Sequence, residues 1–273
     1  MEPFHQWVRR LLFFAGRRET VNYRILLLDS TGSADVGWMR ALEWDEYGFE
    51  IAGRTADPAD AVSALSRGDF DTILCLHRPS QETAVALLSR VQKRLPDVPV
   101  IVVSSADDSA CMRQCFLYGA TDFLVMPLNA DDVRSTLRRT ARQLDRRVMH
   151  EEYQTALDQS ILALQDKGVG DAITEKLREL MEYGQETPLT TEAAAAFFGF
   201  NRDYFTRYFK KNTGITFSEY HKGFTMEYAK LLLSGGHFKV QEVSDILGFS
   251  SADYFTRIFK KRTGKTPSEF KKL

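Results

Sequence analysis

Two matching sets of charged and polar residues lie fifty positions apart and have the types needed to bind a polyanion. The segment DYFTRYFKKNTGITFSEYHK, residues 203–222, is identical at 14 of 20 positions to DYFTRIFKKRTGKTPSEFKK, residues 253–272. In each copy the apolar residues recur at helical spacing, which leaves the polar residues on the opposite face of one helix. Arginine can donate two hydrogen bonds to one guanine, and lysine pairs with phosphate, so these faces are suited to nucleic acid.

The repeats also predict the elements that hold these faces. Gly199 and Gly248 each follow a short helical segment, where a left-handed residue can end a helix, and a second helix begins a few residues later. The residues expected in the core are Phe205, Tyr208, Phe209, Phe255, Ile258 and Phe259. A helix, a tight turn and a second helix with a polar, arginine-bearing face form the unit that places a helix in a DNA major groove.

The charge distribution separates this half of the chain from the rest. Residues 186–273 contain 14 Lys and Arg against 9 Asp and Glu, a net charge of +5, whereas residues 1–185 contain 22 against 28, a net charge of −6. The sum over all 273 residues is −1. A basic C-terminal part joined to an acidic N-terminal part favours a polyanion-binding module attached to a second domain, although a merely solvated basic face has the same composition.

From about residue 171 to the C-terminus, the sequence resembles the DNA-binding domain of the AraC/XylS family. The resemblance rests on the paired YFTRxFKKxTG strings, on TPSEF at residues 266–270 and on the connecting segment FSEYHKGFTMEYAKLLLS at residues 217–234. The family often has alanine four residues before the turn glycine. Ala195 keeps this pattern, and Ser244 departs from it mildly while remaining small.

The resemblance implies that the helices at residues 202–211 and 252–261 are recognition helices that enter successive major grooves, about 34 Å apart. The candidates for base contacts are Arg202, Asp203, Thr206, Arg207, Asp253, Thr256 and Arg257. The candidates for phosphate contacts are Lys210, Lys211, Lys260 and Lys261. Two helical hairpins with solvated basic faces are the alternative. The repetition of Asp, Thr, Arg and Lys favours DNA binding, because core packing alone would preserve only the apolar positions.

The N-terminal half alternates between short apolar runs and helical patterns. The expected strands are residues 23–28, 49–54, 72–76, 99–104 and 122–126. The expected helices are residues 36–47, 58–66, 83–95, 109–117 and a helix that begins at Asp131. Five such units predict an α/β fold with a doubly wound, five-stranded parallel sheet, followed by an all-α domain with two helix-turn-helix units. Ligand sites in a doubly wound sheet lie at the carboxyl ends of the strands.

Residues 23–144 resemble a CheY-like response-regulator receiver domain, on the strings DTILCL, VPVIVVSSADD and YGATDFLVMPLNADDV. Receivers hold magnesium with an acidic pair after the first strand, accept a phosphoryl group on an aspartate after the third, and contact that group with a lysine before the fifth-strand proline. The corresponding residues here are Asp29, Ser30, Leu76, Ser104 at the Ser/Thr switch position, and Met126. Leucine offers no nucleophile, and one carboxylate is a poor magnesium site. We therefore predict a degenerate receiver without phosphorylation chemistry.

The pocket that remains is predicted to be apolar and to be lined by Leu76, His77 and Met126. One interpretation is a site for a small molecule or a partner. The other is that side chains fill the pocket and the domain only dimerises. The second is favoured, because a leucine and a methionine at strand ends are more often core residues, and His77 is expected to be an ordinary surface histidine. No catalytic residue, cofactor or metal site is predicted.

The cysteines and apolar runs bear on the compartment and on metal binding. Three cysteines, an odd number in a chain without an export signal, argue against a disulfide framework. Cys111 and Cys115 would share a helix face, but no His or Cys pair lies nearby in sequence to complete a zinc tetrad, so all three, with Cys75, are expected to be buried apolar residues. The uncharged apolar run at residues 11–15 is too short to cross a bilayer, so a cytoplasmic protein is expected.

A helical linker is predicted at residues 145–170. Apolar residues at steps of three and four run from Val133 to Leu164 across a highly charged stretch. They predict either a coiled-coil dimer or an amphipathic helix that packs on its own receiver. The segment KGVGD at residues 167–171 predicts a flexible break, and Asp171 is expected to cap the helix that follows.

The chain is thus predicted to have an N-terminal arm at residues 1–22, a degenerate receiver-like domain at 23–144, the linker at 145–170 and an AraC-type domain at 171–273. The arm combines aromatic residues with arginines, and it is expected to pack on the receiver or to be disordered, with association with a membrane surface as the alternative.

These features predict a sequence-specific DNA-binding transcription regulator that is not an enzyme and is controlled independently of aspartate phosphorylation. We expect a homodimer on double-stranded promoter half-sites, with RNA polymerase as a candidate further partner and no membrane association. One alternative is a signalling adaptor that uses both halves for protein contacts and does not read DNA. The other is a conventional phosphorylated regulator.

Overall fold

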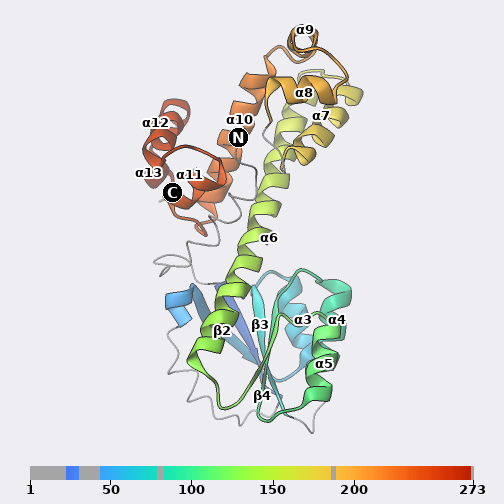
Figure 1. Ribbon diagram of the computed structural model, residues 1–273, viewed down its shortest axis with the longest axis vertical. Helices are drawn as coiled ribbons and strands as arrows, with labels where there is room; N and C mark the ends of the chain where they lie inside the picture. Colours follow the sequence, from blue (N-terminus) through green and yellow to red (C-terminus); the bar gives the residue numbers. More distant parts are fainter. Residues whose placement is uncertain (1–22, 31–43, 79–82, 186–188, 272–273) are drawn as a thin grey trace. The chain divides into compact units, whose positions relative to one another are not determined.

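The computed structural model describes residues 23–30, 44–78, 83–185 and 189–271 (Figure 1). The chain divides into two compact units between Val148 and Met149, the first α/β and the second helical. This division falls four residues beyond the predicted end of the receiver segment. The predicted arm, residues 1–22, lies outside the described residues.

The first unit contains a five-stranded parallel sheet in the order β2-β1-β3-β4-β5. The strands are β1 (Tyr23–Leu28), β2 (Phe49–Thr55), β3 (Thr72–His77), β4 (Val100–Ser104) and β5 (Asp122–Val125). The predicted fold class is confirmed, with each strand within one residue of its expected bounds. Strands β1, β3 and β4 are almost continuously buried, as expected for parallel strands covered on both faces.

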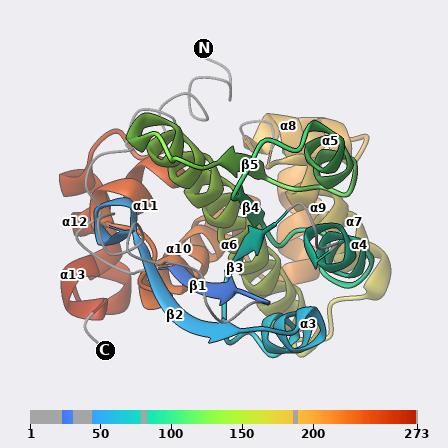
Figure 2. The same cartoon turned by 90° about the horizontal axis from the view of Figure 1, so that it is seen from below.

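Helices cover both faces of this sheet. Helices α3 (Pro58–Ser66), α4 (Thr83–Arg94) and α5 (Ser109–Leu117) lie along one face (Figure 2), and α6 (Ala130–Gln165) packs its first half on the other. Of the helix predicted at residues 36–47, only Trp44–Tyr47 is described, as the 3₁₀ helix η1, and the remainder lies outside the described residues.

Helix α6 has 36 residues and contributes buried side chains to both units. Val133, Leu137 and Leu144 pack in the core on one face of the sheet. In the second unit, Leu157 and Ile161 of the same helix are buried. The first half of the predicted apolar stripe therefore packs on the receiver of its own chain, as in the second alternative, whereas the second half is buried in the helical unit.

The predicted break after α6 is a hydrogen-bonded turn. The N–H of Val169 donates to the carbonyl of Leu164 at 3.1 Å, and Gly168 has a φ of 82°. The prediction that Asp171 caps the next helix is wrong, because Gly170 is the N-cap of α7 (Asp171–Tyr183) and Asp171 is already its first residue. From there its carboxylate still interacts favourably with the positive end of the helix.

The second unit continues with two copies of a helix pair joined by one long helix. Its helices are α8 (Thr191–Phe197), α9 (Arg202–Thr213), α10 (Phe217–Ser234), α11 (Val240–Ile246), α12 (Ala252–Thr263) and α13 (Pro267–Phe270). The predicted helical domain with two helix-turn-helix units is confirmed. Helix α10 has the predicted bounds, and α9 and α12 extend two residues beyond theirs.

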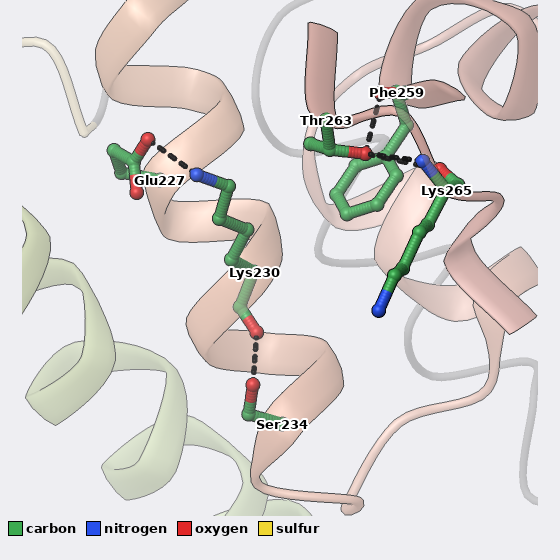
Figure 3. A network of polar contacts seen from close by, with 6 residues as sticks. All are labelled: Glu227, Lys230, Ser234, Phe259, Thr263 and Lys265. Atoms are coloured by element: carbon green, nitrogen blue, oxygen red, sulfur yellow. Dashed lines mark hydrogen bonds and ion pairs between the residues drawn. The ribbon is translucent and has the colours of Figure 1, made fainter. Parts of the chain in front are cut away.

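The same local hydrogen bonds end the equivalent helices of the two copies. The hydroxyl of Thr263 donates to the carbonyl of Phe259 at 2.9 Å and accepts from the N–H of Lys265 at 3.4 Å (Figure 3). Thr213 makes the matching bonds, at 2.8 Å to Phe209 and 3.5 Å from Ile215. Each threonine hydroxyl therefore links the last turn of its helix to the residue two positions further along the chain.

Candidate functional site

Helices α9 and α12 each bury an aromatic face and expose a charged one. Phe205 and Phe209 of α9 are fully buried, as are Phe255 and Phe259 of α12. The ring of Phe209 lies 5.6 Å from that of Phe217 at the start of α10, in an edge contact. Such aromatic pairs fix how each helix is rotated about its axis, and hence which residues face solvent.

All the predicted charged residues of these two helices are exposed. They are Arg202, Asp203, Arg207, Lys210, Lys211, Asp253, Arg257, Lys260 and Lys261. Thr206 and Thr256 are half-buried, and the hydroxyl of Thr206 donates to the carbonyl of Arg202 at 2.8 Å. The two positively charged faces therefore have the exposure that contact with a polyanion requires.

Two residues predicted in the core lie instead at its edge. Tyr208 and Ile258 are half-buried. The ring of Tyr208 contacts Phe200 at 5.1 Å and stacks on Tyr204 at 6.2 Å. These positions lie at the border between the apolar and polar faces, where helical spacing alone does not decide burial.

The matching arginines of the two helices are held differently. The Nε of Arg207 donates to the carbonyl of Asp203 at 3.4 Å, within its own helix. The guanidinium of Arg257 lies over the ring of Tyr254 at 5.8 Å, within the range of a cation–π contact. Arg202 pairs with Glu192 of α8 at 3.1 Å, and alanine occupies the equivalent position 252. The two faces thus present similar charge with different side-chain arrangements.

Tyr204 and Tyr254 belong to the same exposed faces and were missed by the sequence reasoning. They occupy equivalent positions, and 48% and 44% of their surface is exposed. The signal that could have identified them is the repeat itself, which keeps tyrosine at both positions outside the core spacing. A large exposed ring beside an arginine can contact bases or sugars.

The tight turns before α9 and α12 also repeat. The N–H of Phe200 donates to the carbonyl of Ala195 at 2.9 Å, and the N–H of Phe249 donates to that of Ser244 at 3.0 Å. Both small residues are buried, which explains why the position favours alanine. Ser244 places a hydroxyl there, and this oxygen is buried without a hydrogen-bond partner within the described part of the chain.

The five receiver-pocket positions lie at or just beyond the carboxyl ends of the strands. Asp29 is buried. Its carboxylate accepts a hydrogen bond from the guanidinium of Arg54, near the end of β2, and forms an ion pair with it. Ser30 is half-buried. The hydroxyl of Ser104 is buried and donates to the carbonyl of Ala106 at 2.6 Å.

The two apolar positions of this pocket belong to the domain core. Leu76 and Met126 are half-buried and pack against the cluster between the sheet and α6. This arrangement supports the interpretation in which side chains fill the pocket. The magnesium ion implied by the receiver family does not fit these residues, because the Asp29 carboxylate is paired with Arg54 and neither Leu76 nor Met126 offers an oxygen ligand.

The prediction that His77 is a surface histidine is wrong, because it is 3% exposed. Cys75 and Cys115 are buried as predicted, whereas Cys111 is only half-buried, because it lies in the first turn of α5 near the sheet edge. The fold brings His77 and Cys111 together with Asp108, with one ligand atom of each within 4.8 Å of the others. Their separation in sequence hid this grouping.

Two sequence-family models match the chain. The response regulator receiver domain matches residues 25–138, and the helix-turn-helix domain matches residues 194–273. The chain therefore consists of a receiver domain followed by an AraC-type helix-turn-helix domain, as the sequence resemblance predicted. Among the described residues, no helix has both the length and the apolar character needed to cross a membrane.

Individual proteins and solved domains are similar to this chain at low identity. The "Transcriptional regulatory protein HptR" of Staphylococcus aureus (strain N315) is 22% identical over 229 residues, which cover 84% of this chain and 90% of the relative. The C-terminal domain of the two-component response regulator yesN from Fusobacterium nucleatum is 29% identical and covers 37% of this chain and 99% of that chain, with a TM-score of 0.35. The REC domain of AraT from Geobacillus stearothermophilus is 17% identical and covers 46% of this chain and 97% of that chain, with a TM-score of 0.39.

Proposed function

We propose that this protein is a sequence-specific DNA-binding regulator of transcription that is controlled without aspartate phosphorylation. The observation that carries the proposal is the pair of matching charged faces on α9 and α12, each set against a buried aromatic anchor. The Staphylococcus aureus relative is named a transcriptional regulatory protein and aligns with this chain over 90% of its own length, which supports the proposal.

The exposed residues divide into two roles by their chemistry. Arg202, Arg207 and Arg257 can read guanine with paired hydrogen bonds, and Asp203, Thr206, Asp253 and Thr256 lie close enough along the helices to contact neighbouring bases. The lysines in the last turn of each helix, Lys210, Lys211, Lys260 and Lys261, bind phosphates and set the register without reading sequence.

The residues of the receiver pocket support control without phosphorylation. Position 76 carries leucine where the nucleophile would stand, and Asp29 is neutralised by Arg54. We propose that the receiver domain acts through the dimeric state of the protein, which would place four recognition helices on repeated half-sites and bring a bound dimer near RNA polymerase. Sedimentation of the full chain, alone and with selected DNA, tests the dimer.

DNA binding is tested by selecting duplexes from a random pool with the full chain and titrating the selected duplex against salt. Binding should weaken linearly on a plot of log affinity against log salt concentration. Arg207→Ala should cost about 1–3 kcal/mol and relax the sequence preference, whereas Lys211→Ala should weaken all duplexes alike and reduce the salt slope by about one.

Lys230→Ala is the matched control for these variants. Lys230 lies on α10, outside both recognition helices, and its Nζ pairs with Glu227 at 2.7 Å (Figure 3). This variant should bind DNA like the parent. If no duplex is enriched, or if Arg207→Ala and Lys230→Ala behave alike, the adaptor alternative replaces the proposal.

Phosphorylation is tested separately by incubating the chain with acetyl phosphate and magnesium and measuring its mass. The proposal expects no added phosphoryl group, because leucine has no acceptor oxygen. A phosphorylated species would show that the chain is a conventional phosphorylated regulator. This result would not affect the conclusion on DNA binding, which the salt titration decides.

A further inference from the structure

Three side chains from β3 and the start of α5 meet at the carboxyl edge of the sheet. His77 ends β3, Asp108 precedes α5, and Cys111 lies in the first turn of α5. One ligand atom from each residue lies within 4.8 Å of the others, and the Nε2 of His77 is 3.8 Å from the Oδ2 of Asp108. Imidazole, carboxylate and thiolate are three donor types that zinc accepts together.

Of the three residues, His77 gives the strongest evidence for a bound ligand. Its ring is buried, and neither ring nitrogen has a hydrogen-bond partner in the part of the chain that the structure describes. An imidazole without partners would normally lose about 1–3 kcal/mol by this burial. Burial also lowers the pKa of His77, which favours the neutral form that binds metals.

Asp108 caps α5 with one carboxylate oxygen, and its second carboxylate oxygen is not used by the cap. Its Oδ1 accepts the N–H of Cys111 at 2.9 Å and caps α5, while Oδ2 is the oxygen that lies toward His77. The separation of 3.8 Å is too long for a hydrogen bond. It exceeds by a few tenths of an ångström the distance of about 3.4 Å between nitrogen and oxygen ligands on a tetrahedral zinc ion.

Cys115 lies one helical turn after Cys111 but outside the group of three, because its sulfur is not within 4.8 Å of all their donor atoms. Its Sγ atom is 3.7 Å from that of Cys111, so the two thiols contact each other. Burial raises the pKa of Cys111 and raises that of Cys115 to about 12, so without a cation both remain protonated at neutral pH. A bound cation would displace the proton of Cys111.

We propose that His77, Asp108 and Cys111 bind a zinc(II) ion, with a water molecule in the fourth position. Magnesium and calcium prefer oxygen ligands throughout and would not select this set. The ion would join the end of β3 to the start of α5, whose residues otherwise meet through apolar packing. This site uses none of the five receiver-pocket residues, and it does not depend on the proposed DNA binding.

The test uses the full chain, reduced and freed of metal, with Co²⁺ as a spectroscopic probe. Titration should produce a thiolate-to-cobalt charge-transfer absorption that saturates at about one equivalent and disappears when Zn²⁺ is added. Cys111→Ser and Asp108→Asn should each weaken Co²⁺ binding by at least about tenfold. Asparagine keeps the helix cap, so the second variant removes the charge without removing the local structure.

Two control variants match these changes. Asp107→Asn alters the exposed neighbour of Asp108, and His150→Ala alters an exposed histidine outside the cluster, so both should bind Co²⁺ like the parent. Cys115→Ser should keep the charge-transfer band, because Cys115 is outside the group of three ligands. Circular dichroism of each variant establishes that it is folded.

The proposal is overturned if the parent shows no charge-transfer band, or if Cys111→Ser and Asp108→Asn bind Co²⁺ as the parent does. Loss of the band in Cys115→Ser would show that the three-residue ligand set is wrong. His77→Gln should abolish tight binding. If this variant does not fold, Cys111→Ser and Asp108→Asn decide the question, because both residues lie on or next to α5 and outside the sheet.

Discussion

Replacing Ser244 with alanine should stabilise the helical unit. Ser244 lies in α11 and is fully buried, and its hydroxyl has no hydrogen-bond partner among the described residues. A buried hydroxyl in this state costs about 1–3 kcal/mol, and alanine adds about 0.5 kcal/mol of helix propensity. The small void left by one oxygen offsets part of this gain. We therefore expect the free energy of unfolding to rise by about 1–2 kcal/mol.

The first repeat provides the reverse experiment. Ala195 occupies the equivalent buried position in α8, and its carbonyl accepts the same turn hydrogen bond. Ala195→Ser introduces a hydroxyl into this environment and should destabilise the unit by about 1–3 kcal/mol. The two variants exchange the same pair of residues at equivalent places, so changes in the unfolded chain contribute similarly to both and with opposite sign.

Differential scanning calorimetry of the full chain measures both effects. Ser244→Ala should raise the Tm of the helical unit by about 3–8 °C, and the transition of the receiver unit should stay where it is. If Ser244→Ala lowers this Tm, the hydroxyl is stabilising, and the reasoning from burial is refuted. A neutral Ala195→Ser would refute the claim that the two turns are equivalent.

Three further predictions concern the backbone, pH and the buried carboxylate. Gly264→Ala should lower the free energy of unfolding in urea by about 1 kcal/mol, because Gly264 has a φ of 81°. Gly223 lies inside α10, and a Cβ there meets no atom within 4 Å, so Gly223→Ala should raise the free energy of unfolding by up to about 1 kcal/mol. Burial lowers the pKa of His221, so the unfolded chain binds more protons than the folded chain as the pH falls below about 6.5. The Tm of the helical unit should therefore decline between pH 7 and 5.5. The decline should be smaller in His221→Gln. Arg54→Ala should destabilise the receiver unit by about 1–3 kcal/mol, measured by urea unfolding, and adding Asp29→Asn should recover part of this loss because it removes the buried charge. An equal loss in the presence and absence of Asp29→Asn would show that packing, and not charge, accounts for the role of Arg54.

Local signals explain why much of the fold could be predicted from the sequence. Helix α10 has its predicted bounds because Thr216 and Glu219 form a capping box at its start. Each helix-turn-helix unit was visible because the repeat displays the same spacing twice. The strands were visible because parallel strands covered on both faces need continuous apolar runs, and such runs are short and easily recognised.

Features that depend on distant neighbours were not predicted. The burial of His77 and its approach to Asp108 follow from the position of α5 beside β3, which no local pattern encodes. The border position of Tyr208 was missed for a related reason, since its burial depends on Phe200 and Tyr204. Asp171 was misassigned as a cap because Gly170 and Asp171 are both acceptable at a helix start, and only the backbone angles distinguish them.

The proposed loss of phosphorylation chemistry in the receiver pocket is explained partly by the sequence and partly by the structure. Leu76 is visible in the sequence as a missing nucleophile, but the sequence does not say what becomes of the carboxylate that would have faced a magnesium ion. Asp29 remains buried, and a buried carboxylate without a cation is costly. Arg54, from the neighbouring strand, supplies the positive charge that magnesium supplies in receivers that are phosphorylated. The pair therefore makes retention of Asp29 compatible with loss of phosphorylation, and it explains why restoring an aspartate at position 76 alone should not restore a magnesium site.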